Sequence, residues 1–258
     1  MKINENLLVI LQARMSSSRF PGKVLSLING QPMIFWQIAR IKKSKYVSDI
    51  VVATSDDHTD DELTSYLEGI GVAVIRGDLE NVYDRFIKVL IRFRSKYFVR
   101  LTADCPLVMP DLIDLIFEKF ITEDCDYISN AINPTYPDGL DIEILKTNAF
   151  EKLIKLDLSP AEKEHVTLGI YSRRTEFNVF SYENIENMSS ERWTVDYPED
   201  LEFVRGVYSK FKGKESKFSM REVSDLLREY PGLRNKMGSN YRNISLKRSP
   251  DDIGFKNE

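Results

Sequence analysis

Short apolar runs alternate along the first 130 residues with stretches whose apolar positions recur at helical spacing. Leu112, Ile113 and Ile116, for example, would share one face of a helix. The predicted strands are 7–11, 50–54, 73–76, 97–101 and 127–129, and the predicted helices are 31–42, 59–69, 80–92 and 111–120. Strands that alternate with helices of about a dozen residues predict an α/β fold with a largely parallel sheet and helices on both faces.

The pattern changes after residue 130. Residues 133–139 are rich in turn formers and precede shorter elements. These are predicted strands at 141–145, 177–181 and 192–195, and predicted helices at 148–156, 160–173, 198–208 and 220–230. Neither an internal repeat nor a Gly/Ser linker occurs. We therefore predict one domain over 1–245, with an elaboration at 130–190 and a polar tail at 246–258.

Composition limits the partners. The chain has 258 residues and a formal net charge of −4, which argues against non-specific binding to nucleic acid. Cys105 and Cys125 are its two cysteines, so no disulfide framework is implied and a reducing compartment is expected. The polar N-terminus does not resemble a signal peptide, and no apolar run approaches the ~18 residues of a membrane span. These features predict a cytoplasmic protein without a membrane partner.

A basic loop follows the first predicted strand. It carries Arg14, Arg19 and Lys23, three consecutive serines and a Pro-Gly turn. Cations, hydroxyls and backbone N–H groups at the end of a buried strand suit a polyanion such as a triphosphate. The alternative is a solvated basic surface loop.

Two aspartates follow other predicted strands. Asp104 comes after 97–101 and precedes Cys-Pro, and Asp196 closes 192–195. In parallel sheets, ligands bind at the carboxyl ends of the strands, so the basic loop, 54–58, 77–78 and 102–106 are expected on one rim. Two carboxylates there could hold Mg²⁺ together with substrate phosphates. The alternatives are a turn or capping role for Asp104 and a helix N-cap for Asp196.

A further polar cluster lies in the elaboration. Asp141 and Glu143, two positions apart, would share one face of a strand, where they could bind polyol hydroxyls or be solvated. His165, on a predicted helix, could face a ligand or cap a turn.

Several segments together resemble the acylneuraminate and 3-deoxy-manno-octulosonate cytidylyltransferases, with the closest likeness to a branch named for spore-coat polysaccharide biosynthesis. The segments are 12–23, 53–55, 76–78, 83–85, 100–106, 137–143, 164–167 and 193–200. The resemblance extends to about residue 245. Two departures stand out: Ser16 replaces a usual glycine, and Phe20 replaces a common leucine.

The resemblance implies a GT-A-like nucleotide-diphospho-sugar transferase fold, usually a homodimer, and Mg²⁺-dependent transfer of CMP from CTP to a sugar hydroxyl. It assigns catalysis to Arg14, Lys23, Asp104 and Asp196, the last two as metal ligands. Further nucleotide-binding residues would be Gln12, Ala13, Ser16, Ser17, Arg19, Thr54, Arg76, Arg85 and Thr102. Arg76 and Arg85 could equally be ion-pair partners. The sugar side would comprise Tyr127, Asn130, Asp141, Glu143 and His165.

The sugar is expected to be a nonulosonate-like sugar acid, and 130–190 would serve sugar binding and dimerisation. Two other functions compete with this hypothesis. One is a glycosyltransferase that consumes a nucleotide-sugar. The other is a non-catalytic nucleotide-binding subunit of a polysaccharide assembly.

Overall fold

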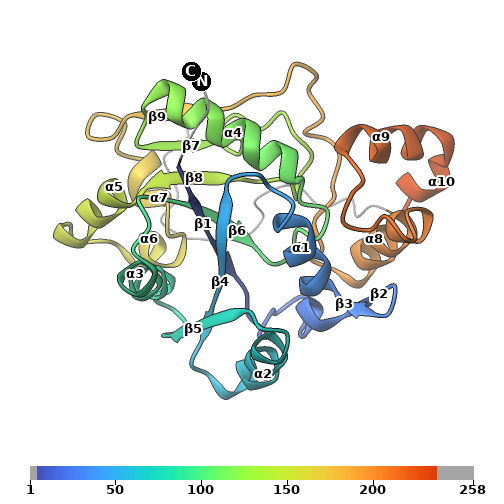
Figure 1. Ribbon diagram of the computed structural model, residues 1–258, viewed down its shortest axis with the longest axis horizontal. Coiled ribbons are helices and arrows are strands. Elements are labelled where there is room, and N and C mark those ends of the chain that lie inside the picture. Colours follow the sequence, from blue (N-terminus) through green and yellow to red (C-terminus); the bar gives the residue numbers. More distant parts are fainter. Residues whose placement is uncertain (1–4, 237–258) are drawn as a thin grey trace.

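One mixed sheet forms the centre of the protein (Figure 1). The structure is a computed structural model that describes residues 5–236. The strand order is β5-β4-β1-β6-β8-β7-β9. The bounds are β1 Leu7–Gln12, β4 Val47–Ser55, β5 Ala73–Gly77, β6 Tyr97–Thr102, β7 Tyr127–Ser129, β8 Glu143–Lys146 and β9 Val179–Ser181. Strands β5, β4, β1 and β6 pair in parallel, whereas β8 is antiparallel to both β6 and β7. A short hairpin, β2 Leu27–Ile28 and β3 Gln31–Pro32, lies outside the sheet.

Helices cover both faces of this sheet, as predicted. Successive residues of β1 point to opposite faces, so Leu7 and Val9 join one apolar core and Leu8 and Ile10 join the other. The first core is completed by α1 Met33–Ile41, α2 Asp61–Gly69, α4 Pro110–Glu123, α8 Pro198–Lys210 and α9 Met220–Glu229. The second is completed by α3 Val82–Phe93, α5 Thr147–Lys152 and α7 Leu168–Tyr171. Figure 1 shows α3 and α1 on opposite sides of β1 and β4.

The remaining elements are short. They are η1 Lys23–Leu25, η2 His58–Asp60, η3 Leu153–Lys155, α6 Pro160–Glu164 and α10 Pro231–Arg234. Within residues 5–236, no helix combines the length and apolar composition that crossing a membrane requires. The predicted tail, 246–258, lies outside the described residues, and the single-domain assignment stays a prediction.

Three predicted elements after residue 130 were wrong in detail. The helix expected over 160–173 is two helices, because Val166 has a φ of 28° and interrupts the turn between α6 and α7. The strand expected at 192–195 is an extended segment with one isolated bridge, from Arg192 to Asp138. Its backbone N–H groups bond to two different segments. The strand expected from 141 begins at Glu143, because the Ile142 N–H bonds to a side chain instead.

The turn at 137–140 docks onto the extended segment 191–195. Asp138 N donates to Glu191 O at 2.9 Å, and Trp193 N donates to Asp138 O at 2.6 Å. Gly139 has a φ of 102°, and a Cβ there would lie 2.5 Å from Thr194 N. Only glycine fits such an approach in this backbone conformation. The turn therefore sets the position of the segment that leads to Asp196.

Candidate active site

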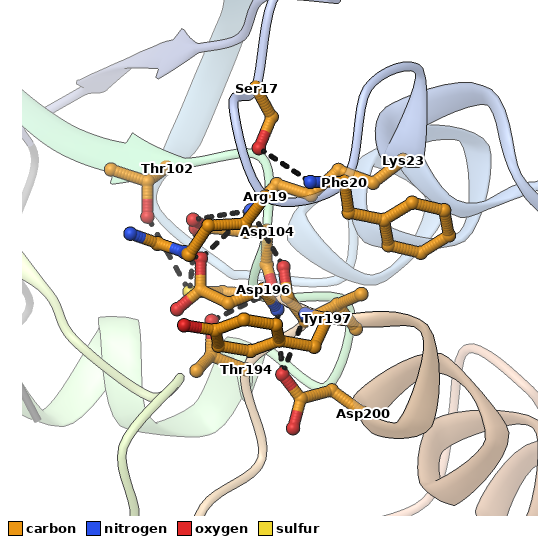
Figure 2. A network of polar contacts seen from close by, with 12 residues as sticks. Ser17, Arg19, Phe20, Lys23, Thr102, Asp104, Thr194, Asp196, Tyr197 and Asp200 are labelled. Atoms are coloured by element: carbon orange, nitrogen blue, oxygen red, sulfur yellow. Dashed lines mark hydrogen bonds and ion pairs between the residues drawn. The ribbon is translucent and has the colours of Figure 1, made fainter. Parts of the chain in front are cut away.

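Lys23 joins the two aspartates that the sequence singled out (Figure 2). Its Nζ donates to Asp104 Oδ2 at 3.2 Å, to Asp196 Oδ1 at 3.1 Å and to Val195 O at 2.7 Å. Lys23 follows Gly22, whose φ of 73° turns the basic loop, and only 7% of the residue is exposed. Residues 81 and 173 positions apart thus meet around one ammonium group. The predicted convergence at the carboxyl edge of the sheet is confirmed.

The basic loop is folded around its own backbone. Gly22 N donates to Met15 O at 2.9 Å, and Ser17 Oγ accepts from Phe20 N at 3.3 Å. This shape directs Arg19 inward, where its Nη2 lies 2.6 Å from Asp196 Oδ1. The loop is therefore tied to the aspartates and is not a purely solvated surface loop.

Arg192 is a site residue that the sequence reasoning missed. Its Nη1 lies 2.7 Å from Asp138 Oδ2, and its Nη2 lies 2.8 Å from Asp196 Oδ2. The same Nη2 is 3.3 Å from Asp200 Oδ2. The available signal was an arginine four positions before Asp196, in a segment with three acids. Arg192 thus holds the outer oxygen of Asp196 and leaves the other oxygen for Lys23 and Arg19.

Neither aspartate caps a helix, although Asp104 does lie in a turn, as its alternative proposed. Helix α8 is capped reciprocally by Tyr197 and Asp200, and Asp200 Oδ2 accepts from Asp196 N at 2.8 Å. Helix α4 begins at Pro110, well beyond Asp104. Both carboxylates instead face the cations of the basic loop.

The opposite charges of this cluster stabilise one another and shift the pKa values of its members. Burial alone would raise the pKa of Asp196, but the Lys23 charge and the hydrogen bonds from Arg19 and Arg192 hold that pKa well below its ordinary value. Burial also opposes ionisation of Asp104, yet Lys23 brings the pKa of that carboxyl down. The two carboxylates in turn outweigh the burial of Lys23 and raise the pKa of its ammonium. All three groups are charged at neutral pH.

These shifts predict that the protein loses stability in acid. Asp104 and Asp196 have folded-state pKa values below the ordinary 3.8. Their contribution to stability is therefore present above that value and is lost as the pH falls through the folded pKa. We expect the free energy of unfolding, measured in urea, to decrease as the pH is lowered from about 5 to about 3. Asp196→Asn should flatten this dependence, and an unchanged slope in the variant would contradict the assignment.

A second network links the sheet edge to the elaboration. Glu143 pairs with Arg100, and its Oε1 accepts from Tyr127 Oη at 2.7 Å and from Thr167 Oγ1 at 2.5 Å. Arg100 Nη2 donates to Gln12 Oε1 at 3.1 Å. Glu143 is 9% exposed, so the solvated alternative for this carboxylate was wrong. Gln12, Tyr127 and Glu143, predicted for the nucleotide and sugar sides, are brought into one network.

The other predicted sugar-side residues are Asn130, Asp141 and His165. The Asn130 side chain is buried and bonded at both ends to backbone, to Leu140 O and Ile142 N at 2.8 Å each. Asp141 precedes β8 and so does not share a strand face with Glu143, contrary to expectation. His165 directly follows α6, with its backbone N–H bonded to Ala161 O, and its assignment to the sugar side stays a prediction.

The other residues predicted to bind the nucleotide lie around the rim of the sheet. Arg14 is exposed, Ala13 is buried beside β4, and Thr102 Oγ1 lies 3.5 Å from Cys105 Sγ. Ser16 keeps a negative φ, so its replacement of glycine costs no backbone strain. Arg76 bonds to Ser55 O, Asp57 O and Asp61, as the ion-pair alternative proposed. Arg85 is 1% exposed and donates to Leu79 O at 3.0 Å, while its Nε and Nη1 have no partner.

Asp60 is a second residue whose role was missed. The acidic run at 56–61 has the composition of a helix start, and α2 does begin at Asp61. The fully buried Asp60 carboxylate instead accepts from Met15 N at 2.7 Å, from Ser55 N at 3.0 Å and from Thr54 Oγ1 at 2.8 Å. Asp60 therefore ties the basic loop to the end of β4. Thr54, which was predicted to bind the nucleotide, donates its hydroxyl hydrogen to this carboxylate.

The donor set around Lys23 fits a divalent ion that arrives with phosphates. Asp104 and Asp196 reach a common cation, and Mg²⁺ in proteins often takes one or two carboxylates together with substrate phosphates and water. Among residues 5–236, no group of three or more His, Cys, Asp or Glu side chains is arranged to hold a metal. Asp104 and Asp196 could thus supply the carboxylate ligands of such a site.

A basic loop and two aspartates at the carboxyl edge of parallel strands are typical of nucleotide-binding proteins of the α/β class. The family model described as "Cytidylyltransferase" matches residues 8–223. The chain belongs to the cytidylyltransferase family, and it is a nucleotidyltransferase enzyme. The resemblance noted from the sequence is confirmed.

Three known proteins illustrate the relationship. The spore coat polysaccharide biosynthesis protein SpsF of Bacillus subtilis is 32% identical over 235 residues, which cover 88% of this chain and 95% of that protein. A 3-deoxy-manno-octulosonate cytidylyltransferase of Bdellovibrio bacteriovorus is 33% identical over 114 residues, 44% of this chain and 45% of that enzyme. The structure of a cytidylyltransferase from Leptospira borgpetersenii superposes with a TM-score of 0.85 at 28% identity, covering 93% of this chain and 100% of that one. The predicted fold class is confirmed.

Proposed function

We propose that this enzyme transfers CMP from CTP to a hydroxyl of a sugar acid and releases pyrophosphate. The observation that carries the proposal is the meeting of Lys23, Arg19, Asp104 and Asp196 at the carboxyl edge of the sheet. The name of the Bdellovibrio relative, which specifies an octulosonate sugar acid, supports the substrate class. We further propose that the sugar is nonulosonate-like and is destined for a cell-surface polysaccharide, a destination that the name of SpsF supports.

Phosphoryl transfer depends mainly on positioning and charge neutralisation, and the basic loop supplies both. Lys23 and Arg19, with Arg14 at the exposed rim, bind the triphosphate and offset the negative charge on the departing pyrophosphate. The sugar hydroxyl, most simply the anomeric hydroxyl of an α-keto acid sugar, attacks the α-phosphorus in line. Asp104 and Asp196 would hold Mg²⁺, whose chemistry at such a site is polarisation of the α-phosphate.

Other parts of the proposal rest on less specific features. The network of Gln12, Tyr127 and Glu143 connects the nucleotide edge to the elaboration, and it supports a sugar site at that border. A homodimer contact over 130–190 is proposed from the family resemblance alone. Cys105 and Cys125 are free and buried, as suits a reducing, cytoplasmic location.

A matrix of nucleotides and sugars tests the function. Each of CTP, UTP, ATP and GTP is incubated with a panel of sugar acids and neutral sugars, with and without Mg²⁺, and pyrophosphate release is recorded. We expect release with CTP and one class of sugar acid, only when Mg²⁺ is present. Cleavage of a supplied nucleotide-sugar would favour a glycosyltransferase. Tight CTP binding without turnover on any sugar would favour a nucleotide-binding subunit.

A further inference from the structure

The carboxylate oxygens of Asp104 and Asp196 are all engaged by donors of the chain itself. Lys23 donates to Asp104 Oδ2, and both Lys23 and Arg19 donate to Asp196 Oδ1. Arg192 takes Asp196 Oδ2 at 2.8 Å, and the Cys105 thiol lies 3.4 Å from Asp104 Oδ1. A divalent ion that bridges the two carboxylates through their inward-facing oxygens, Asp104 Oδ2 and Asp196 Oδ1, must therefore displace protein donors.

Lys23 is the donor that blocks the site most directly. Its ammonium bridges the two inward-facing oxygens and is held from behind by Val195 O at 2.7 Å. The side chain is 9% exposed, so water cannot readily take over its hydrogen bonds. Because like charges repel strongly at contact distance in such surroundings, the ammonium and a divalent ion cannot share these two oxygens.

Phosphates offer Lys23 and Arg19 an alternative set of partners. Ammonium and guanidinium groups form strong, charge-assisted hydrogen bonds with phosphate oxygens. A bound triphosphate would let both side chains change partners and would also add ligands for the metal. Metal and nucleotide would then bind together, each favouring the other.

We infer that Lys23 is the resident counter-ion of the Asp104–Asp196 pair in the nucleotide-free enzyme, and that it makes divalent-metal binding depend on the nucleotide. The inference rests on the proposed function in one respect, the assignment of these aspartates to the metal. It gives Lys23 two alternating partners: the carboxylates before CTP binds, and the phosphates afterwards.

Mn²⁺ binding to the full chain without nucleotide, followed by electron paramagnetic resonance, tests the inference. Removing the ammonium in Lys23→Met should tighten Mn²⁺ binding by about tenfold or more, because the ion no longer competes with a charge at the same oxygens. Lys23→Arg keeps the charge and should bind Mn²⁺ as weakly as wild type. Lys119→Met, which removes the partner of Glu123 at 2.5 Å on α4, is the matched control and should change nothing.

Two further measurements locate the effect. Adding Asp104→Asn to Lys23→Met should remove the gain, because the ion loses one of its two carboxylates. The non-hydrolysable analogue α,β-methylene-CTP should tighten Mn²⁺ binding to wild type by about tenfold or more, and to Lys23→Met by less. If Lys23→Met does not fold, judged by its thermal transition, Lys23→Gln provides the test. It also removes the ammonium, keeps a polar side chain near Val195 O, and should tighten metal binding in the same direction.

The inference would be overturned if wild type and the folded uncharged variant bound Mn²⁺ with equal affinity. It would also be overturned if the CTP analogue did not change the Mn²⁺ affinity of wild type. These results are distinguishable from failure of the proposed reaction. Pyrophosphate release by wild type with an unaltered metal affinity in Lys23→Met would reject the counter-ion role alone. A gain in affinity that depends on Asp104, in an enzyme inactive across the whole sugar matrix, would support the counter-ion role and reject the reaction.

Discussion

Replacing Asp104 with asparagine is expected to lower the turnover number for pyrophosphate release by about 10²–10³-fold, as loss of a preorganised electrostatic group does in other enzymes. The substitution preserves the shape of the side chain and removes its charge. Lys23 keeps its bonds to Asp196 at 3.1 Å and to Val195 at 2.7 Å. The neutral amide still offers one oxygen, so the free energy of unfolding should change by only about 1 kcal/mol.

Steady-state kinetics with CTP and the sugar found in the matrix measure the first effect, and urea unfolding measures the second. Asp124→Asn is the matched control, since Asp124 also pairs with a lysine, Lys146, at 2.7 Å but is 89% exposed at the end of α4. The control should retain near-normal turnover. A folded Asp104→Asn enzyme with near-normal turnover would show that the metal and catalytic assignment is wrong.

Replacing Arg192 with methionine is expected to destabilise the protein by about 3–5 kcal/mol, the range found when one partner of a buried ion pair is removed. The Arg192 guanidinium forms ion pairs with Asp138, Asp196 and Asp200, and its side chain is only 7% exposed. Methionine fills similar space but leaves three carboxylates close together without it. Turnover should fall as well, because Asp196 loses the group that orients its outer oxygen.

Urea unfolding followed by circular dichroism gives the stability of each variant. Arg192→Lys should recover only part of the loss, since a single ammonium cannot reproduce the fork that reaches several carboxylates. The control is Arg228→Met, whose 2.7 Å pair with Asp225 is more than half exposed and should be worth less than about 1 kcal/mol. A loss for Arg192→Met no larger than this control's would contradict the proposed role of Arg192.

The parts of the site that the sequence revealed are those with a local signature. Arg19 and Lys23 lie in one loop directly after a continuous apolar run, and Asp104 follows another such run. Parallel pairing of β1 with β6 then brings the ends of those runs to the same edge. The reason is that side-chain polarity changes abruptly where a strand leaves the core.

Arg192 and Asp60 had no comparable signature. Each acts through contacts with segments distant in sequence: Arg192 reaches Asp138, 54 positions away, and Asp60 reaches Met15, 45 positions away. The segment at 192–195 has the composition of a strand, yet Val195 N bonds to Asp104 O at 2.8 Å and Trp193 N bonds to Asp138 O at 2.6 Å. Local propensity could not show that its backbone partners are two separate segments.

The sequence by itself determined the alternation of strands and helices, the apolar face of the helix at 111–120, the basic loop and the two acidic positions that follow apolar runs. These properties depend on the order of residues and on the periodicity of regular structure. Only the tertiary structure decided that Lys23 bridges both carboxylates, that Arg192 holds one of them from behind, and that Glu143 is buried in a network. Those facts depend on which distant segments approach one another, because a charged group finds its partner through space and not along the chain.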